Sequence, residues 1–422
     1  MKYDQYTSDK VQPKDFVSGW IIAFLIAGTG LTLPMFFLGS EIALSIGFKD
    51  ALIAFSISTL ILTIFSSVTT RIGNRSRLST YMILHFSFGR KGTKIINLIF
   101  GFALLGWYSF ALELLAGAIG DMTSEVFEIS LPQTFSIILV SLLIIFTTLY
   151  GIQRIEKLNN ITVPIITVFF CYVLYECFDK YSPTEIWNFV PSNKDMTLFD
   201  ATTILVESSI LFPILMADFS RFARNDRQSL IAVLGIAFGF PIALIFCAIP
   251  AILTGEVDIM RILFEFKLII PAFGLLFIST WAANSSNLYS AVLTVATIKT
   301  SWSFKSLTLL LGILGSVMAL FEFSKYLFDF LNLLGVLTPA ISSIYIIDFF
   351  LIRKQQYVLK EIKEWGYSAL VSWVLSSTVS AMSYYNLISI TGMYFLDAFL
   401  SGGILYVLFK WKSVGYKSVK SK

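Results

Sequence analysis

Apolar stretches of about twenty residues recur along almost the whole chain, and they limit its fold more than any other feature. A helix of that length crosses the hydrocarbon core of a bilayer, whereas a membrane-spanning strand needs only about ten residues. Hydrophobic residues make up 56% of the 422 residues and charged residues only 14%, against about 25% charged residues in a soluble domain. The sequence therefore predicts an all-α polytopic membrane protein.

Twelve of these stretches are predicted to be transmembrane helices, and the loops between them are too short for a soluble domain. The predicted spans are 17–46, 50–70, 94–120, 132–151, 159–178, 199–222, 229–253, 268–297, 305–321, 327–352, 367–385 and 388–411. Lys and Arg gather in alternate loops, so the positive-inside rule places those loops and both termini in the cytoplasm. We expect a multi-pass protein of the cell (plasma or inner) membrane, a monomer in the lipid bilayer with no nucleic-acid partner.

The sixth predicted span carries polar residues and a proline at mid-membrane depth. In order they are Glu207, Ser208 and Ser209, then Phe212 and Pro213. Pro213 has no backbone N–H, and its ring clashes with the carbonyl four residues earlier, so we expect the helix to break here. Broken backbone survives in a bilayer only where it is buried in protein or lines a cavity. This stretch is therefore predicted to form one wall of a substrate site.

The first predicted span has a comparable interruption, the sequence GTGLTLP over Gly28–Pro34. Five helices separate the two interruptions, and this odd offset inverts the second half of the chain relative to the first. Paired interruptions at corresponding places in inverted halves indicate a transporter site at the midplane of the membrane. The alternative is that Gly and Pro are simply common in membrane helices.

Two tryptophans also lie in corresponding elements of the two halves, Trp107 in the third span and Trp281 in the eighth. A deeply placed aromatic ring can present a flat face to a planar ligand. Gly106 and the polar run Asn284–Asn287 adjoin these two residues, and unpaired polar groups in hydrocarbon cost several kcal/mol each. We therefore expect both tryptophans to face a cavity, with packing against lipid or core as the alternative.

Four stretches resemble the nucleobase–cation-symport-1 family, and most of all its cytosine permease-like branch. They are HFSFGRKG (His85–Gly92), ADFSRFARN (Ala217–Asn225), the motif over Trp281–Tyr289, and the end of the tenth span within Thr338–Phe350. ADFSRFARN is the most specific of the four. With the matching pattern of spans, the resemblance covers nearly the whole chain.

The resemblance implies a leucine-transporter-type fold in a single transporter domain. Residues 17–178 would form the first repeat of a five-plus-five inverted repeat, 199–352 the inverted second repeat, and 367–411 two extra helices, with helices 1 and 6 broken. Such proteins take up nucleobases, hydantoins and related heterocycles, usually with Na⁺ or H⁺.

Site residues follow from the resemblance by position. Trp107 would stack on the substrate, the helix 6 residues Ser208–Pro213 would supply backbone and hydroxyl contacts, and two helix 8 residues would meet substrate or ion. The helix 8 residues are Ser279 and Asn284, and the helix 1 residues that would face a cation are Gly28, Gly30 and Leu33.

Several positions depart from the family pattern. Ala282 and Ala283 replace two threonines whose hydroxyls help to hold Na⁺, a hard ion that prefers oxygen ligands, so a sodium site is doubtful. Leu104 replaces a glutamine of helix 3, and Ser209 replaces a stacking phenylalanine for which Phe212 is near enough to substitute. These changes weaken the fit to cytosine itself, and no other cofactor is expected.

Two carboxylates, Glu113 and Glu207, lie at membrane depth, where ionisable groups are costly and usually functional. Burial favours the neutral form of a carboxyl group. We therefore hypothesise that Glu207, beside the helix 6 interruption, carries a coupling proton or pairs with a cationic substrate group. Glu113 faces away from Trp107 on the same helix, and an interhelical hydrogen bond is an equal explanation for it.

These observations together predict a secondary active transporter that imports a flat heterocycle, such as cytosine or a related pyrimidine or vitamin precursor, by alternating access. An amino-acid carrier of the same fold is an alternative, although Glu207 argues against an anionic group beside it. A channel or a non-transporting receptor fits less well. An enzyme is not expected, because the sequence shows no nucleophile triad and no metal-ligand cluster.

Overall fold

The computed structural model describes residues 10–150, 152–191, 196–298 and 301–419, and this part of the chain is helical without a named strand. An isolated bridge between Val17 and Ala223 is its one β-type pairing. The α-helices are α1 (Gly19–Gly30), α2 (Leu33–Ile46), α3 (Phe48–Ser76), α4 (Thr80–Phe127), α5 (Gln133–Tyr150), α6 (Ile152–Lys180), α7 (Pro183–Trp187), α8 (Leu198–Ser209), α9 (Leu211–Ser220), α10 (Asp226–Thr254), α11 (Ile259–Glu265), α12 (Ile269–Ala296), α13 (Phe304–Leu320), α14 (Leu327–Leu337), α15 (Pro339–Ile347), α16 (Tyr367–Tyr384) and α17 (Tyr394–Val419). The all-α prediction is confirmed.

Each of the twelve predicted spans has a helix, or a pair of consecutive helices, at its place in the chain. Within the described residues, 8 helical segments are long and apolar enough to cross a membrane, and the bent pair α1–α2 brings the count to 9. The other three predicted spans correspond to α13, α16 and α17. The total of twelve crossings therefore stays a prediction.

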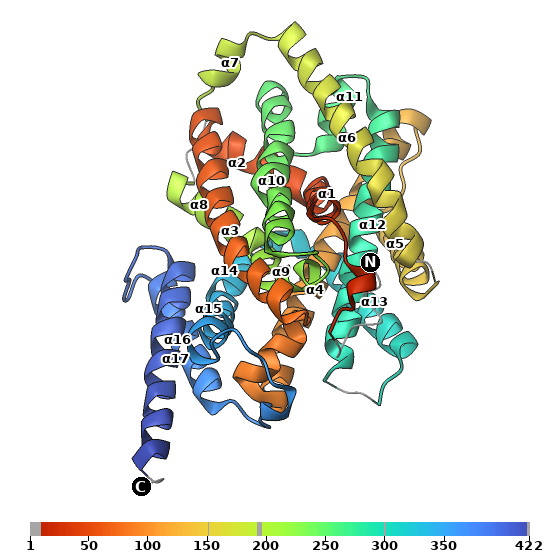
Figure 1. Ribbon diagram of the computed structural model, residues 1–422. Helices are drawn as coiled ribbons and strands as arrows, with labels where there is room; N and C mark the ends of the chain where they lie inside the picture. Colours follow the sequence, from red (N-terminus) through yellow and green to blue (C-terminus); the bar gives the residue numbers. More distant parts are fainter. Residues whose placement is uncertain (1–9, 151, 192–195, 299–300, 420–422) are drawn as a thin grey trace.

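The helices pack as two groups with an added pair. One group contains α1, α2, α3, α8, α9 and α10, and the other contains α4, α5, α12 and α13. Helices α16 and α17 pack against each other and against α14 and α15, and Figure 1 shows them side by side at one edge of the molecule. Corresponding members of the predicted repeats, such as α3 and α10 or α4 and α12, fall in the same group.

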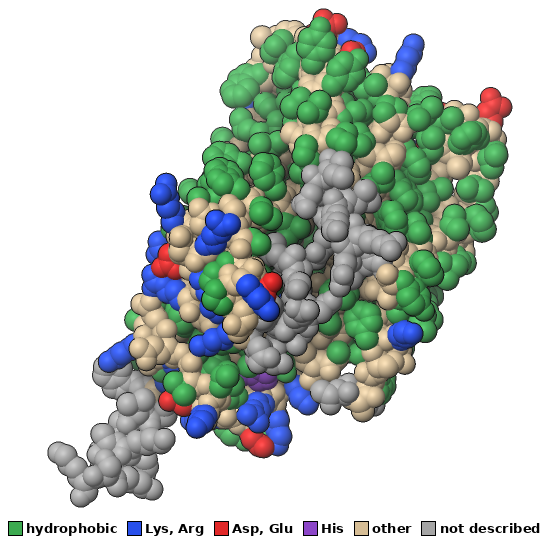
Figure 2. All heavy atoms as spheres, turned by 45° about the vertical axis from the view of Figure 1, so that its right-hand side comes forward, with side chains coloured by type: hydrophobic (Ala, Val, Ile, Leu, Met, Phe, Trp, Pro, Cys, Tyr) green, Lys and Arg blue, Asp and Glu red, His purple; other side chains and the backbone are tan. Residues whose placement is uncertain are grey.

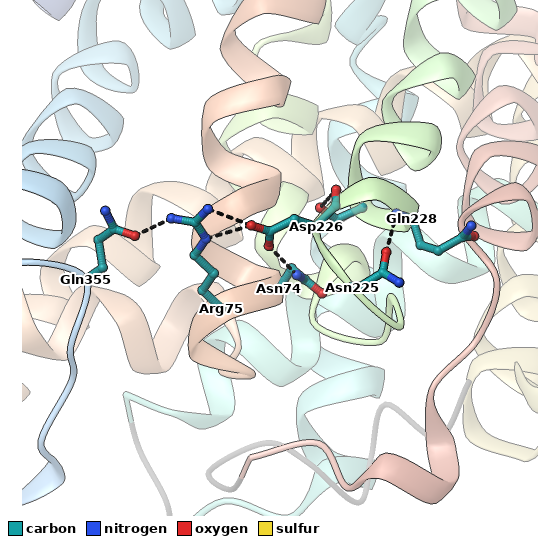
Figure 3. Close-up of polar contacts among 7 residues, drawn as sticks. Asn74, Arg75, Asn225, Asp226, Gln228 and Gln355 are labelled. Atoms are coloured by element: carbon teal, nitrogen blue, oxygen red, sulfur yellow. Dashed lines mark hydrogen bonds and ion pairs between the residues drawn. The ribbon is translucent and has the colours of Figure 1, made fainter.

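Polar contacts tie three elements of the first group together at one end, and Figure 3 shows those between α3 and α10. The Arg75 guanidinium on α3 donates to Asp226 Oδ2 at the start of α10, at 2.6 and 2.9 Å, and also to the side chain of Gln355. Asn74 donates to Asp226 Oδ1 at 2.6 Å. On the same helix α10, Gln228 Oε1 accepts the backbone N–H of Gly19 at 2.7 Å, so the start of α1 is fixed as well.

Charged side chains are unevenly distributed over the surface. Figure 2 shows Lys and Arg gathered over the lower part of the view, while hydrophobic side chains dominate the middle and upper flank. Exposed aliphatic and aromatic residues such as Phe24, Leu60 and Phe146 are each more than half exposed. This is the surface of a protein that faces lipid over most of its height.

The two predicted interruptions differ in size. Helices α1 and α2 meet at 61° across Leu31 and Thr32, so the break in helix 1 is present. Helices α8 and α9 instead meet at Ile210, which keeps right-handed helical torsions (φ −60°, ψ −28°), and together they form one span, Leu198–Ser220. The expected break in helix 6 is therefore weaker than predicted. Pro213 is the third residue of α9, where a backbone N–H has no intrahelical partner to lose.

Candidate functional site

The break in helix 1 lies directly against helix 8. Leu31 leaves the helical conformation (φ −88°, ψ 61°), and Thr32 is extended before α2 begins. The backbone N–H of Leu33 then donates to Thr280 Oγ1 on α12 at 3.1 Å, in a buried setting. The first N–H groups of a helix have no acceptor within that helix, and Thr280 supplies one for the N–H of Leu33. The predicted residues Gly28, Gly30 and Leu33 are all buried at this corner.

Trp107 lies on α4, close to the same stretch of α12. Its ring packs edge-on against Phe110 and Phe330, with centroids 6.2 and 6.0 Å away. Asn284 on α12 donates from Nδ2 to the backbone carbonyl of Tyr108 at 3.1 Å. Tyr108 and Phe110 are fully buried, whereas Trp107 keeps part of its ring accessible. Asn284 thus lies against the backbone next to Trp107, and a shared substrate site for the two residues stays a prediction.

The polar atoms of α12 at this level are not all satisfied. Asn284 is fully buried, and its Oδ1 has no hydrogen-bond partner among the described residues. Ser279, by contrast, donates to the carbonyl of Leu276 within its own helix at 3.2 Å. A buried amide oxygen without a partner is costly, so it is a natural acceptor for a donor on a bound molecule.

Helix 6 contributes Phe212 to the neighbourhood of the helix 1 break. The ring of Phe212 packs edge-on against Phe240 of α10 at 5.2 Å, and a side chain added at Gly30 would press on that same Phe240 ring. Phe212 keeps part of its ring accessible, like Trp107. The hydroxyl of Ser208 donates to the carbonyl of Leu205 at 2.9 Å, and Ser208 and Ser209 are both buried.

Glu207 occupies a separate position on helix 6. Its carboxylate lies against Gly335 of α14, so closely that a Cβ at Gly335 would overlap it. Glu207 is 0% exposed, and neither carboxylate oxygen has a hydrogen-bond partner among the described residues. The hydroxyl of Tyr394 lies beside the carboxylate but donates its proton to Asn332 Oδ1 at 2.8 Å. This placement suits the predicted proton role of Glu207 better than the predicted contact with substrate.

Two other predicted residues have packing roles. Glu113 accepts the backbone N–H of Ser324 at 2.8 Å and also its hydroxyl, in the turn Phe323–Tyr326 before α14. This is the interhelical hydrogen bond that the sequence offered as one of two explanations. Trp281 donates from Nε1 to Thr147 Oγ1 of α5 at 3.2 Å, so its polar edge is directed at a neighbouring helix. The expectation that Trp281 faces a cavity like Trp107 has no support in this contact.

The helix 1 corner offers few free oxygens to a sodium ion. The carbonyl of Gly28 already accepts the N–H of Leu31 at 3.3 Å, and the carbonyl of Thr29 accepts the hydroxyl of Thr32 at 3.3 Å. Across from this corner on α12, Ala282 and Ala283 have no side-chain oxygen. A hard cation prefers several oxygen ligands, and the doubt about a sodium site at this corner stays a prediction.

Sequence reasoning missed several residues that shape this region. Phe330 and Gly335 of α14, Phe240 of α10 and Tyr394 of α17 all contact predicted site residues. They are aromatic or glycine residues in apolar helices and carry no motif. Their role follows from contacts between distant parts of the chain, which helical periodicity does not reveal.

Comparison with known proteins relates the chain to transporters. A family profile described as "Permease for cytosine/purines, uracil, thiamine, allantoin" matches residues 10–405. The cytosine permease of Escherichia coli (strain K12) is 27% identical over 335 residues, which are 79% of this chain and 78% of the permease. The hydantoin permease of Microbacterium maritypicum is 23% identical over 402 residues, covering 88% of this chain and 80% of that one.

The fold is also that of a solved transporter in two conformations. Mhp1, a nucleobase-cation-symport-1 family transporter, in a closed conformation with bromovinylhydantoin bound, superposes with a TM-score of 0.82 at 19% identity, covering 96% of this chain and 95% of that one. The inward-facing conformation of Mhp1 gives a TM-score of 0.84 at 18% identity, with 96% and 93% covered. The leucine-transporter-type fold predicted from the sequence is confirmed at this level.

Proposed function

The chain belongs to the family of permeases for cytosine/purines, uracil, thiamine and allantoin, and from this membership we propose that it imports a flat nitrogen heterocycle stacked on Trp107. The family match confirms the predicted family and supports the function of a secondary active transporter rather than an enzyme. The identity of the substrate and the residues that bind it are the proposal.

One observation carries this proposal: the free Oδ1 of Asn284 is buried, and the Nδ2 of the same side chain donates to the carbonyl of Tyr108, the residue that follows the partly accessible Trp107 in the chain. A planar ring that stacks on the indole face places the substituents of its edge in the plane of that ring. A ring N–H or an exocyclic amine on that edge would supply the donor that Asn284 Oδ1 lacks. Nucleobases and hydantoins carry such donors, and a simple aromatic hydrocarbon does not.

The neighbourhood of the site is consistent with a neutral, flat guest. The helix 1 corner, helix 8 and helix 3 meet through the Leu33–Thr280 bond and through the edge-on contact of Phe37 with Phe110 at 5.6 Å. Phe212 adds a second partly accessible ring on helix 6. Aromatic faces select for planarity, and the few polar groups select among planar molecules.

The coupling ion in this proposal is a proton and not Na⁺. The helix 1 corner and the Ala282–Ala283 pair do not present the oxygens of a sodium site, whereas Glu207 is a buried carboxylate without a partner. We further propose that both termini lie in the cytoplasm of a cell (plasma or inner) membrane and that the protein acts as a monomer, since one chain supplies every residue of the site.

Binding of heterocycles to the purified protein tests the site. Cytosine, uracil, thiamine, allantoin and hydantoin are screened by thermal shift, because a ligand at 100 times its Kd stabilises the native state by about 2.7 kcal/mol. Trp107→Ala is expected to abolish the shift for any compound that binds the wild type. Trp187→Ala, which removes a half-exposed tryptophan on α7, is the matched control and should leave the shift intact. An undiminished affinity in Trp107→Ala would place the binding site elsewhere.

A further inference from the structure

The pocket around Glu207 is closed by three helices outside the proposed stacking site. Glu207 comes from α8, Gly335 from α14 and Tyr394 from the first turn of α17. A side chain at Gly335 would overlap the carboxylate and force Glu207 to move. The carboxylate is thus enclosed between helix 6, helix 10 and the last helix of the chain. Neither helix 10 nor the last helix is the counterpart of helix 6 in the predicted inverted repeat.

The Tyr394 hydroxyl beside this carboxylate belongs to a short chain of hydrogen bonds through Asn332 to Tyr384. Asn332 Nδ2 donates to the hydroxyl of Tyr384 at 3.1 Å, and Asn332 Oδ1 accepts the O–H of Tyr394 at 2.8 Å. The only proton of the Tyr394 hydroxyl is therefore committed to Asn332, and its oxygen is left as an acceptor toward Glu207. A protonated Glu207 can donate to that oxygen, whereas an ionised Glu207 would compete with Asn332 for the Tyr394 proton.

No charged group compensates a negative Glu207. Among the described residues, Tyr394 is the titratable group that interacts with this carboxylate, and no Lys or Arg acts on it. Asp200, at the start of α8, and Tyr384, at the end of α16, act on the Tyr394 hydroxyl and not on the carboxylate. An unpaired, fully buried carboxylate is costly in the interior of a membrane protein, so the pocket favours the neutral acid.

We propose that Glu207, Tyr394 and Asn332 form a proton-binding site between helices 6, 10 and 12, separate from the stacking site at Trp107. One proton binds the Glu207 carboxylate to give the neutral acid, which donates to Tyr394, and the same proton leaves when the pocket opens. This deepens the proposed function, because the proton taken up is the one that drives import.

Helix α14 connects the two sites. Phe330 packs against Trp107, and Gly335, five residues later on the same helix, packs against Glu207. The two contacts lie about 7.5 Å apart along the helix axis. Ionisation of Glu207 would introduce a hydrated charge beside Gly335 and move α14 away from α8, and Phe330 would move with it. The protonation state of Glu207 and the packing of Phe330 against Trp107 are in this way coupled through helix α14.

The position of Tyr384 indicates the side of the membrane from which protons reach Glu207. Tyr384 is 37% exposed at the end of α16, just before the connection to α17. With both termini in the cytoplasm, this connection lies on the outer side of the membrane. Protons are then expected to reach Glu207 from the outside, beside Tyr394, when α14 moves.

Infrared difference spectroscopy of the purified protein tests the site without any substrate. A carboxyl C=O band that disappears as the pH is raised is expected in the wild type. The band should be lost in Glu207→Gln, and in Tyr394→Phe its frequency and its midpoint should both change, because the hydroxyl beside the acid is gone. Glu113→Gln is the matched control: Glu113 is also buried in a helix but has hydrogen bonds from Ser324, and the band should persist.

An unchanged band in Glu207→Gln, with the protein still folded by its thermal unfolding profile, would overturn the proposal. So would a Tyr394→Phe spectrum identical to that of the wild type. Because Gln has nearly the same shape as Glu and needs no proton, Glu207→Gln is expected to fold.

Transport in proteoliposomes separates this inference from the proposed function. Radiolabelled cytosine is the probe, and internal pH is followed with a trapped dye. The inference predicts that cytosine uptake acidifies the lumen in the wild type and that Glu207→Gln abolishes the proton signal while cytosine still shifts the unfolding temperature. Failure of cytosine to bind the wild type counts against this substrate and leaves the infrared result to decide the proton site. Proton-coupled uptake that persists in Glu207→Gln contradicts the inference and leaves the stacking site in place.

Discussion

Asp348 is a fully buried carboxylate in a hydrogen-bond network that joins three parts of the chain. It accepts Nε of Arg353 at 2.8 Å and the hydroxyl of Tyr406, on α17, at 2.6 Å. Arg353 also donates to the backbone carbonyl of Phe86 at 2.8 Å. The pair thus joins the end of helix 10 to the last helix and to the segment before helix 3, and it occurs in a stretch that resembles the family at the sequence level.

Arg353→Ala is expected to destabilise the protein by about 3–5 kcal/mol, because the buried Asp348 loses its cation. The apparent unfolding temperature in detergent measures this loss. The double variant Asp348→Asn with Arg353→Ala should recover part of it, since the unpaired charge is removed. A double variant that is less stable than Arg353→Ala alone would show that the charge of Asp348 is not the source of the instability.

At the residue level, the sequence identified the carboxylates that are costly to bury in a membrane, but not the residues that contact them. Glu113 and Glu207 were both recognisable as carboxylates at membrane depth, but their surroundings differ. Glu113 accepts hydrogen bonds from Ser324, whereas the carboxylate oxygens of Glu207 have no hydrogen-bond partner among the described residues. Local spacing could not separate the two cases, because both sets of neighbours lie far away in the sequence. Trp107 likewise stays a predicted stacking residue, because its spacing in the sequence does not reveal which distant residues surround it.

At the level of helices, the corner between α1 and α2 depends on one bond from helix 8. Thr280→Val keeps the side-chain volume but removes the acceptor for the Leu33 N–H, and an unsatisfied buried donor costs about 1–3 kcal/mol. We expect a lower unfolding temperature and weaker heterocycle binding, measured by thermal shift.

Thr294→Val is the control for that experiment, because the Thr294 hydroxyl bonds only to the Ser290 carbonyl of its own helix, at 2.7 Å. The control should change both measurements much less than Thr280→Val does. Equal effects of the two variants would mean that the Leu33–Thr280 bond does not hold the corner.

The helix interruptions show what a sequence does and does not specify. Two glycines and a proline around Leu31 predicted the break of helix 1, and the structure bends there by 61°. Pro213 predicted a comparable break in helix 6, but it falls in the first turn of α9, where proline is tolerated. A further break, at Gly89 within α4 (φ 77°, ψ 167°), was not predicted. It is fixed by a distant segment, because the N–H of Gly366 donates to the carbonyl of Phe88 at 2.7 Å.

For the whole molecule, the two helix groups meet at the candidate site. The contacts that cross between them there include the Leu33–Thr280 bond and the Phe37–Phe110 ring pair. Polar contacts at the ends of α1, α3 and α10 hold the first group together, so it can move as a unit; Figure 3 shows the contacts between α3 and α10. Alternating access in this fold then requires that the contacts between the groups change while those within each group persist.

Such a motion needs an ion that binds one arrangement of the groups better than the other. In this chain we expect that ion to be H⁺, so replacing Na⁺ by K⁺ on both sides of a proteoliposome should leave cytosine uptake unchanged. An inward proton gradient should raise it. Uptake that requires Na⁺ in the wild type would contradict this expectation.

The alanine pair on α12 provides the complementary experiment. Ala282→Ser with Ala283→Ser adds two hydroxyl oxygens opposite the helix 1 corner with little added volume, which matters because Ala282 is fully buried. Oxygen ligands are what a hard cation requires. The double variant should therefore bind the heterocycle more tightly in Na⁺ than in K⁺, whereas the wild type should show no difference. If both proteins are indifferent to Na⁺, two hydroxyls at these positions are not sufficient for a sodium site, and the hydrogen-bonded carbonyls of Gly28 and Thr29 would be the next positions to examine.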